Sequence, residues 1–163
     1  MKEVKIGVIS DTHMRHGSLF LEKVIEEYFS AVDLILHAGD VTECSVLEAF
    51  GDKELVVVSG NGDSPEISRR YPKKELIEVN KFRIGVIHGW GMPFGIEKRI
   101  MKAFGRIDCL IYGHTHHAVN HYVNNVLFFN PGSFTRSIAS LFQRSIGIIM
   151  VGGDIKGRII HIN

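Results

Sequence analysis

Residues 4–13 read VKIGVISDTH, and this stretch passes from a β-branched apolar run to a polar cluster. The apolar part, Val4 to Ser10, ends in a small polar residue, which predicts a short buried strand whose carboxyl end opens into a loop at Asp11. Leu19 to Phe29 then places apolar residues at helical spacing, which predicts a helix after that loop. The order of elements that decides the fold is therefore a strand, a polar loop and a helix.

The same order continues beyond Phe29. Leu34 to Ala38 and Leu55 to Ser59 are predicted strands, and Thr42 to Phe50, which ends at Gly51, is a predicted helix between them. Strands that alternate with helices usually pair in parallel, so these strands are expected to share one sheet with the first.

The second half of the chain is richer in strands. Its predicted elements are a hairpin with arms at Glu75 to Val79 and Arg83 to His88, a helix at Ile96 to Phe104, and strands at Cys109 to Tyr112, Ala118 to Val123, Val126 to Phe129, Ser145 to Val151 and Arg158 to Ile162. This order predicts an α/β (α+β) fold in which two mixed sheets form a β-sandwich flanked by helices, rather than one open doubly wound sheet.

Length and composition narrow the class of protein. With 163 residues and 45% hydrophobic content, the chain suits a single domain over residues 1–163. The net charge of +1 gives no reason to expect broad attraction to nucleic acid or membranes. Met1 to Ser10 lacks the pattern of a signal peptide, and no apolar run approaches the ~20 residues that span a bilayer, so we expect a cytoplasmic location. Cys44 and Cys109 are expected to be free thiols.

Five polar clusters each follow a predicted strand. They are Asp11-Thr12-His13, Gly39-Asp40, Gly60-Asn61-Gly62-Asp63, His88-Gly89 and Gly113-His114-Thr115-His116. Because the carboxyl ends of strands converge at one edge of a sheet, these side chains are expected to form one site. Carboxylate, imidazole and amide groups together suit borderline divalent ions such as manganese, iron, zinc, nickel or cobalt. The absence of cysteine from the clusters argues against a structural zinc site.

Two of the clusters carry ligand types at alternate positions. On an extended segment Asp11 and His13 would point to the same side, as would His114 and His116, so each pair is expected to bind one ion or two adjacent ions. Taken alone, an Asp-x-His segment is weak evidence, and a lone histidine at a strand end is more often an ordinary polar residue. The prediction of a shared metal site therefore depends on all five clusters together.

In this order the clusters resemble the calcineurin-like metallophosphoesterase family, whose pattern reads D-x-H, G-D, G-N-x-[DE], H and G-H-x-H. The resemblance spans almost the whole chain, and its length is similar to that of the small single-domain YfcE-type phosphodiesterases. It implies a two-sheet sandwich that holds two divalent ions, with manganese the first expectation. The ligands it implies are Asp11, His13, Asp40 and His116 at one ion and Asp40, Asn61, His88 and His114 at the other, with Asp40 bridging them.

The resemblance also implies an enzyme that hydrolyses phosphate esters, with diesters preferred over monoesters. In such a site a hydroxide that bridges two ions attacks phosphorus in line, and Asp40, Asn61 and His114 are the expected catalytic residues. A small phosphate ester is the expected substrate, and a homodimer is the expected assembly. The alternative is a non-catalytic metal-binding scaffold that binds other proteins, which is the role that a resemblance to the related retromer subunit implies. The intact ligand positions, Asn61 among them, favour the enzyme.

Asn61, Gly89 and Arg136 are the expected contacts with the substrate. Asn61 can both ligate metal and orient a phosphate, and the lack of a side chain at Gly89 allows close approach. Arg136 follows the turn from Asn130 to Ser133 closely enough to reach a phosphate, although that segment can equally be a plain turn.

Gly62 departs from the pattern of many relatives, which carry a histidine or a cysteine at this position. A glycine has no side chain that could protonate the leaving oxygen. We therefore expect weak activity toward alkyl esters and a preference for aryl or other good leaving groups. Asp63 is expected to support His13 or its own loop by hydrogen bonding rather than to act as the acid.

Other residues near the clusters each allow two interpretations. His37 is expected to pack in the core or to support a ligand. His117 is expected to face away from the ligand pair, and the alternative is a position on the substrate side. A basic stretch is either a solvated face or a contact for a phosphate-rich substrate; it comprises Arg69, Arg70, Lys73 and Lys74. An apolar loop either lines the site or packs in a dimer contact; its large residues are Trp90, Met92 and Phe94.

Overall fold

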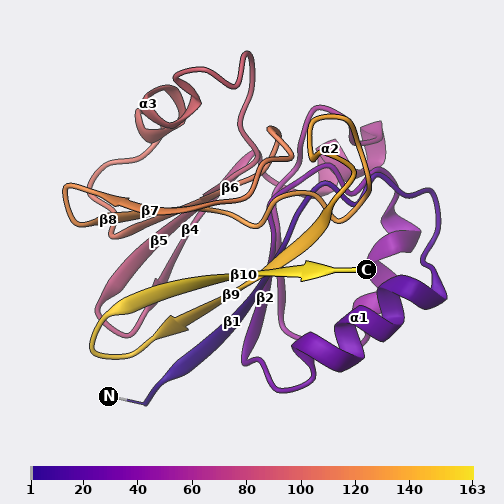
Figure 1. The fold of residues 1–163 in the computed structure, drawn as a ribbon, viewed down its shortest axis with the longest axis horizontal. Helices are drawn as coiled ribbons and strands as arrows, with labels where there is room; N and C mark the ends of the chain where they lie inside the picture. Colours follow the sequence, from indigo (N-terminus) through magenta and orange to yellow (C-terminus); the bar gives the residue numbers. More distant parts are fainter. Residues whose placement is uncertain (1) are drawn as a thin grey trace.

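The computed structural model describes residues 2–163, and Met1, the first residue of the predicted domain, lies outside the described residues. Two five-stranded sheets pack face to face, and helices lie on their outer sides (Figure 1). The predicted two-sheet sandwich flanked by helices is therefore confirmed.

The first sheet has the strand order β10-β9-β1-β2-β3 and the second has the order β4-β5-β6-β8-β7. The first consists of β1 (Val4–Ile9), β2 (Leu34–His37), β3 (Leu55–Val57), β9 (Arg144–Val151) and β10 (Ile155–Ile162). The second consists of β4 (Lys74–Val79), β5 (Phe82–Ile87), β6 (Cys109–Tyr112), β7 (Val119–Val123) and β8 (Val126–Asn130). The helices are α1 (Leu19–Phe29), the 3-10 helix η1 (Cys44–Phe50), α2 (Pro65–Arg70) and α3 (Ile96–Met101).

Parallel pairing brings the carboxyl ends of the central strands together. β1, β2 and β3 are parallel neighbours in the first sheet, as predicted, and β5, β6 and β8 are parallel in the second. The two sets of ends meet across the sandwich, because the backbone N–H of His114, after β6, donates to the carboxylate of Asp11, after β1. One edge of the sandwich thus receives loops from both sheets.

Three apolar layers hold this edge in place. Between the sheets, the β-branched and aliphatic residues of β1 and β2 pack against β5, β6 and β8, with Phe129 fully buried among them. Outside the first sheet, Leu21, Val24 and Phe29 of α1 pack on it, and outside the second sheet Ile96 and Ile100 of α3 do the same. Burial of such side chains contributes about 1.5–3 kcal/mol each, so the loops at the edge rest on a rigid base.

Apart from shifts in bounds, with α3 ending at Met101 instead of Phe104 and β10 beginning at Ile155 instead of Arg158, two segments differ from their prediction. The segment before Gly51 is a 3-10 helix rather than an α-helix, because the N–H groups of Val46 and Gly51 donate to carbonyls three residues back. The short helix α2 was missed, although Ser64 caps it and Pro65 occupies its first turn. Arg69 and Arg70 at the end of α2 were interpreted as part of a basic stretch instead of the last turn of a helix.

The helices within residues 2–163 include none that is long and apolar enough to cross a bilayer.

Candidate metal centre

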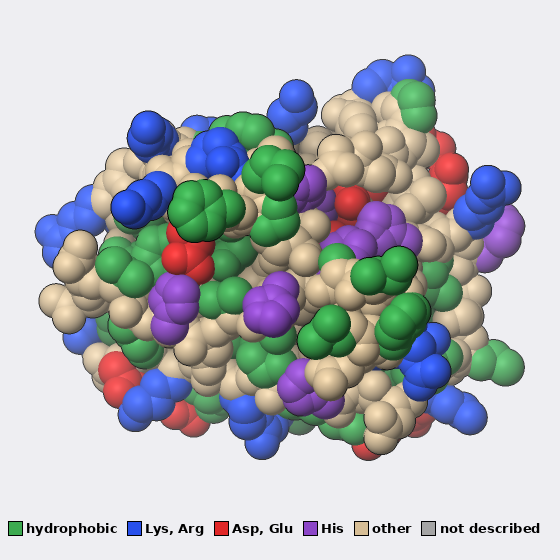
Figure 2. Space-filling view, turned by 45° about the horizontal axis from the view of Figure 1, so that its top comes forward, with side chains coloured by type: hydrophobic (Ala, Val, Ile, Leu, Met, Phe, Trp, Pro, Cys, Tyr) green, Lys and Arg blue, Asp and Glu red, His purple; other side chains and the backbone are tan. Residues whose placement is uncertain are grey.

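All seven predicted ligands lie in loops that leave the carboxyl ends of strands. Asp11 and His13 follow β1, Asp40 follows β2, Asn61 follows β3, His88 follows β5, and His114 and His116 follow β6. Figure 2 shows histidine side chains gathered around acidic atoms in a hollow of one face. The fold therefore collects these residues from both sheets.

Asp11, His13 and His116 form the first group of ligand atoms. Nε2 of His116 lies 3.1 Å from Oδ1 of Asp11 and 3.1 Å from Nε2 of His13. Nε2 of His13 lies 3.7 Å from the same carboxylate oxygen. Two imidazole nitrogens and one carboxylate oxygen thus converge on one point, which is a donor set that suits a divalent ion.

Asp40 connects the first group to His88. Its Oδ2 lies 3.5 Å from Nε2 of His13 and 3.3 Å from Nε2 of His88. Asp11, Asp40 and His88 form a second group of closely spaced ligand atoms. A carboxylate that bridges two ions must have ligands of both ions around it, and Asp40 meets this requirement.

Asn61 and His114 extend the cluster on the side of the second group. Oδ1 of Asn61 lies 2.9 Å from Nδ1 of His114, and Nε2 of His114 lies 2.8 Å from the carbonyl oxygen of Gly91. Because a carbonyl can only accept, the proton of a neutral His114 ring lies on Nε2, and Nδ1 keeps its lone pair. That lone pair faces the amide oxygen of Asn61, and a shared cation would stabilise the two acceptors together.

The buried polar atoms of the cluster fit the predicted ions. Among residues 2–163, Oδ1 of Asp11 and Nε2 of His88 are buried without a hydrogen-bond partner. Nδ1 of His88 lies 2.8 Å from the carbonyl oxygen of Ala38, so a neutral ring donates there and turns its Nε2 lone pair toward Asp40. Buried polar atoms without partners are costly, and divalent ions would satisfy both of them.

Five of the seven residues have a left-handed backbone conformation. The φ angles are 54° at Asp11, 45° at His13, 55° at Asp40, 68° at His114 and 57° at His116. Such angles are uncommon outside glycine and gather at functional sites. The expectation of extended segments is therefore wrong: the chain has left-handed positions on either side of one intervening residue, and Asp11 and His13 share the first group whereas His114 and His116 lie on different sides of the cluster.

Two serines that the sequence analysis missed orient the ligands. The hydroxyl of Ser10 donates to Oδ2 of Asp11 at 2.5 Å, and the hydroxyl of Ser137 lies 2.9 Å from Nδ1 of His116. These contacts leave Oδ1 of Asp11 and Nε2 of His116 directed into the cluster. Ser10 was noted only as the end of a strand, and no local signal connects Ser137 with a histidine 21 residues earlier.

The loop from Gly60 to Asp63 holds Asp40 from the other side. The backbone N–H of Gly62 donates to Oδ1 of Asp40 at 2.6 Å. The carboxylate of Asp63 accepts from the N–H groups of Gly60 at 2.6 Å and Thr42 at 2.7 Å. Asp63 thus supports its own loop, which is one of the two roles expected for it, and it makes no hydrogen bond with His13 among the described contacts.

The electrostatic field of the cluster favours cations. Burial would raise the pKa of Asp40, but the contact with His88 and the N–H of Gly62 outweigh it and lower that pKa to about 2. Burial would lower the pKa of His88, but the carboxylates of Asp40 and Asp11 outweigh it and raise that pKa to about 9. The contact with Asp11 likewise raises the pKa of His116. The carboxylates that hold protons on these rings favour a metal ion at the same place, and the ion must displace those protons.

His37 lies beneath the cluster and is fully buried. The N–H of Gly39 donates to its Nδ1 at 3.2 Å, so its Nε2 carries the proton and donates to the hydroxyl of Thr12 at 3.1 Å. Burial lowers the pKa of His37 to about 4, although the charge of Asp11 works in the opposite direction. His37 therefore packs in the core and supports the backbone of the Asp40 loop, as expected.

His37 is expected to make the metal-free protein less stable in acid. The unfolded chain takes up a proton on His37 below pH ~6.5, whereas the folded protein takes it up only near pH 4. Between these values stability falls as the pH falls, by roughly 3 kcal/mol at most. Urea unfolding at pH 7 and pH 4.5 in the presence of a chelator should show a smaller loss for His37→Gln than for the wild type. An equal loss in both proteins would contradict this assignment.

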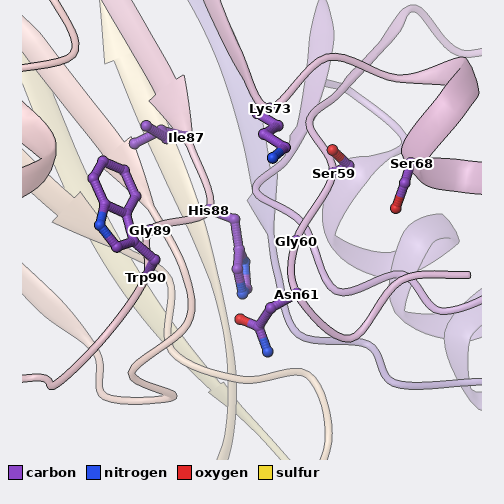
Figure 3. Close-up of a pocket in the computed structure, with 9 residues that line it drawn as sticks. All are labelled: Ser59, Gly60, Asn61, Ser68, Lys73, Ile87, His88, Gly89 and Trp90. Carbon is purple, nitrogen blue, oxygen red and sulfur yellow. The ribbon is translucent and has the colours of Figure 1, made fainter. Parts of the chain in front are cut away.

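A cavity of about 370 Å³ opens beside Asn61 and His88. Figure 3 shows the carboxyl end of β5 with Trp90 on one side of it and Ser59, Ser68 and Lys73 on the other. Gly89, an expected substrate contact, also lines it. This cavity places room for an organic group directly next to the metal ligands.

Arg136 and His117 lie elsewhere. Arg136 lines a separate hollow with Arg144 and His161, so its position gives no support to a contact with substrate. His117 is exposed and lines a hollow that also contains Phe94, away from the ligand pair. The position of Arg136 depends on the path of the loop after Ser133, and the spacing of residues along the sequence could not predict that path.

The sequence of residues 4–154 matches the family model described as the calcineurin-like phosphoesterase superfamily domain. The chain belongs to this superfamily. The match covers every strand and loop that carries a predicted metal ligand. The predicted resemblance is therefore confirmed.

Two named relatives of this phosphoesterase superfamily member come from one archaeon. It is 38% identical to a probable metallophosphoesterase of Methanocaldococcus jannaschii, over 96% of this chain and 81% of the relative. It is 28% identical to a phosphodiesterase of the same organism, over 79% of this chain and 83% of the relative. Among solved structures it is similar to an archaeal phosphodiesterase, with a TM-score of 0.78 and 26% identity over 98% of this chain and 100% of that one.

The fold is also similar to that of vacuolar protein sorting 29 from Cryptosporidium parvum. The TM-score is 0.75 and the identity is 22%, over 99% of this chain and 98% of that one. At this identity the similarity concerns the fold alone.

Proposed function

We propose that this protein is a metal-dependent hydrolase of phosphate esters, with phosphodiesters as preferred substrates and manganese as the preferred ion. The observation that carries the proposal is the convergence of Asp11, Asp40 and their histidine neighbours on two ligand groups, with Asp40 between them. The family and the phosphodiesterases among its relatives support the same reaction.

The residues around the two groups would each contribute to hydrolysis. Two divalent ions held there would supply a nucleophile at neutral pH and offset the negative charge of the transition state. Asn61 lies at the mouth of the cavity and would orient the phosphate through its amide. His114, fixed by Gly91 through Nε2, would present Nδ1 to the ion beside that amide. Asp40, held by the N–H of Gly62, would keep the two ions at a constant separation.

Gly62 provides no group for proton donation to the leaving oxygen. A Cβ at this position would lie 3.1 Å from Cγ of Asp40, so a larger side chain would press on the bridging carboxylate. We infer that the enzyme relies on leaving groups that depart without protonation. General acid catalysis typically contributes about 10²–10⁴-fold, which sets the size of the expected preference.

A screen of metals against substrates tests the function. The metal-free protein would be loaded with manganese, nickel, zinc, iron or cobalt and assayed on bis(4-nitrophenyl) phosphate, 4-nitrophenyl phosphate and a series of aryl and alkyl methyl phosphates. We expect turnover that requires an added ion, is fastest on the diester, and falls steeply as the pKa of the leaving group rises. Equal rates across the leaving groups would contradict the role of Gly62. No turnover with any ion would reject the enzyme and favour a metal-binding scaffold.

A further inference from the structure

The cavity beside the metal centre has one aromatic wall and one cationic wall. Trp90 lies on the side of β5, and Lys73 lies on the opposite side, at the start of β4 (Figure 3). Lys73 alone among the lining residues carries a permanent charge. The volume of the cavity, about 370 Å³, is within the range of small-molecule sites, which is about 300–1,000 Å³.

The backbone that carries the aromatic wall is held by hydrogen bonds. The guanidinium of Arg99 donates to the carbonyl oxygen of Trp90 from Nε at 3.0 Å and from Nη2 at 2.8 Å. Nε2 of His114 donates to the carbonyl of the next residue, Gly91, at 2.8 Å. Trp90 is 47% exposed and so remains available for stacking. Trp90 is thus tied to α3 on one side and to the metal centre on the other.

The cationic wall is equally defined. The N–H of Ser59 donates to the carbonyl of Pro72 at 2.8 Å, which fixes the chain next to Lys73 at the end of β3. Lys73 forms no ion pair with a carboxylate of residues 2–163. Its neighbour Lys74 points elsewhere and donates to the carbonyl of Ala103 at 2.5 Å. The ammonium that faces the cavity therefore has its charge available for a ligand.

We propose that this cavity is a subsite for a mononucleotide that carries a second phosphate. This inference rests on the proposed function: the reacting phosphate, a diester of the nucleoside and a good leaving group, lies at the metal centre, the base stacks on Trp90, and the second phosphate binds Lys73, so that the nucleotide stays with the phosphate when the leaving group departs. Stacking on an indole accepts any base, because every base has a planar π face. The limited volume of the cavity and the net charge of +1 favour a mononucleotide over a nucleic acid chain.

Trp90 gives a direct readout, because it is the single tryptophan of the chain. The manganese-loaded protein would be titrated with adenosine 3′,5′-bisphosphate, adenosine 5′-monophosphate and ribose 5-phosphate while tryptophan fluorescence is recorded. We expect both adenosine nucleotides to quench the fluorescence, with the bisphosphate saturating at about tenfold lower concentration. Ribose 5-phosphate should leave the fluorescence unchanged.

Variants separate the two walls. Lys73→Gln should remove the tenfold advantage of the bisphosphate over the monophosphate, and Lys74→Gln is the matched control that should keep it. Trp90→Leu should weaken inhibition of bis(4-nitrophenyl) phosphate hydrolysis by the bisphosphate about tenfold. Retention of the bisphosphate advantage in Lys73→Gln would overturn the cationic subsite.

The assays distinguish this inference from the function on which it rests. Hydrolysis of bis(4-nitrophenyl) phosphate without any nucleotide quenching would overturn the subsite and leave the phosphoesterase intact. Quenching without hydrolysis would support the nucleotide site and reject the proposed reaction. Tight binding of a single-stranded oligonucleotide in place of mononucleotides would overturn the assigned substrate class.

Discussion

Replacement of Asp40 by asparagine is expected to reduce kcat/KM on bis(4-nitrophenyl) phosphate by about 10³-fold. Oδ2 of Asp40 lies 3.5 Å from His13 and 3.3 Å from His88, so one carboxylate serves both ligand groups. The amide of asparagine lacks the negative charge that would hold two cations together in the proposed site. Removal of one partner from a buried group of charges costs about 3–5 kcal/mol, which corresponds to the expected loss in rate.

The metal content provides a second measurement for Asp40→Asn. We expect about two ions per chain in the wild type and fewer in the variant, as counted by atomic emission after dialysis. Asp52→Asn is the matched control, because Asp52 is exposed and lies outside the metal centre. An Asp40→Asn protein that keeps both its metal and its rate would rule out the bridging role.

Gly60→Ala is expected to lower kcat/KM by about 10²-fold without any change to a ligand itself. A Cβ at Gly60 would lie 2.8 Å from Cδ2 of His88, 2.6 Å from the backbone N of Asp40, and in severe overlap with Oδ1 of Asp40. Both neighbours belong to the metal centre, and neither can retreat because both are buried. Displacement of a reacting group by about 1 Å can cost 10²-fold in rate.

The matched control for Gly60→Ala is Gly105→Ala, since a Cβ at Gly105 meets no atom within 4 Å. Rates, metal content and the free energy of unfolding would be measured for both variants. We expect Gly60→Ala also to lose about 1–3 kcal/mol of stability from overpacking, and Gly105→Ala to lose none. Wild-type kinetics in Gly60→Ala would show that the close approach of this loop to Asp40 is dispensable.

Local signals were sufficient where an element depends on its own residues. Cys109 to Tyr112 is continuously apolar and flanked by polar residues, and it forms β6 over those residues. Leu19 to Phe29 forms α1 as predicted, because its apolar spacing matches one helical face. The prediction of an α-helix from Thr42 to Phe50 was wrong, because the type of helix depends on turns at both ends of the segment. Thr42 and Gly51 have positive φ angles of 88° and 58° there.

Local sequence could not predict which of two adjacent residues contacts the site. Lys73 and Lys74 are identical in type and adjacent, yet one faces the cavity and the other binds the carbonyl of Ala103. Arg136 and Ser137 are also adjacent, and it is the serine that contacts His116. Such differences follow from the direction of each side chain, which is set by the pairing of strands distant in sequence.

The sequence by itself determined that the first three strands share one parallel sheet of a two-sheet sandwich, and which seven residues follow the strands whose ends meet at its edge. Strand ends follow from apolar periodicity, and polar residues that follow buried strands have one edge at which to gather. Only the tertiary structure decided which atoms of those residues face one another, because Asp11 and His116 approach each other across 104 residues of intervening chain through left-handed turns. Contacts of that range depend on how two sheets pack, and packing is a property of the whole core rather than of any segment.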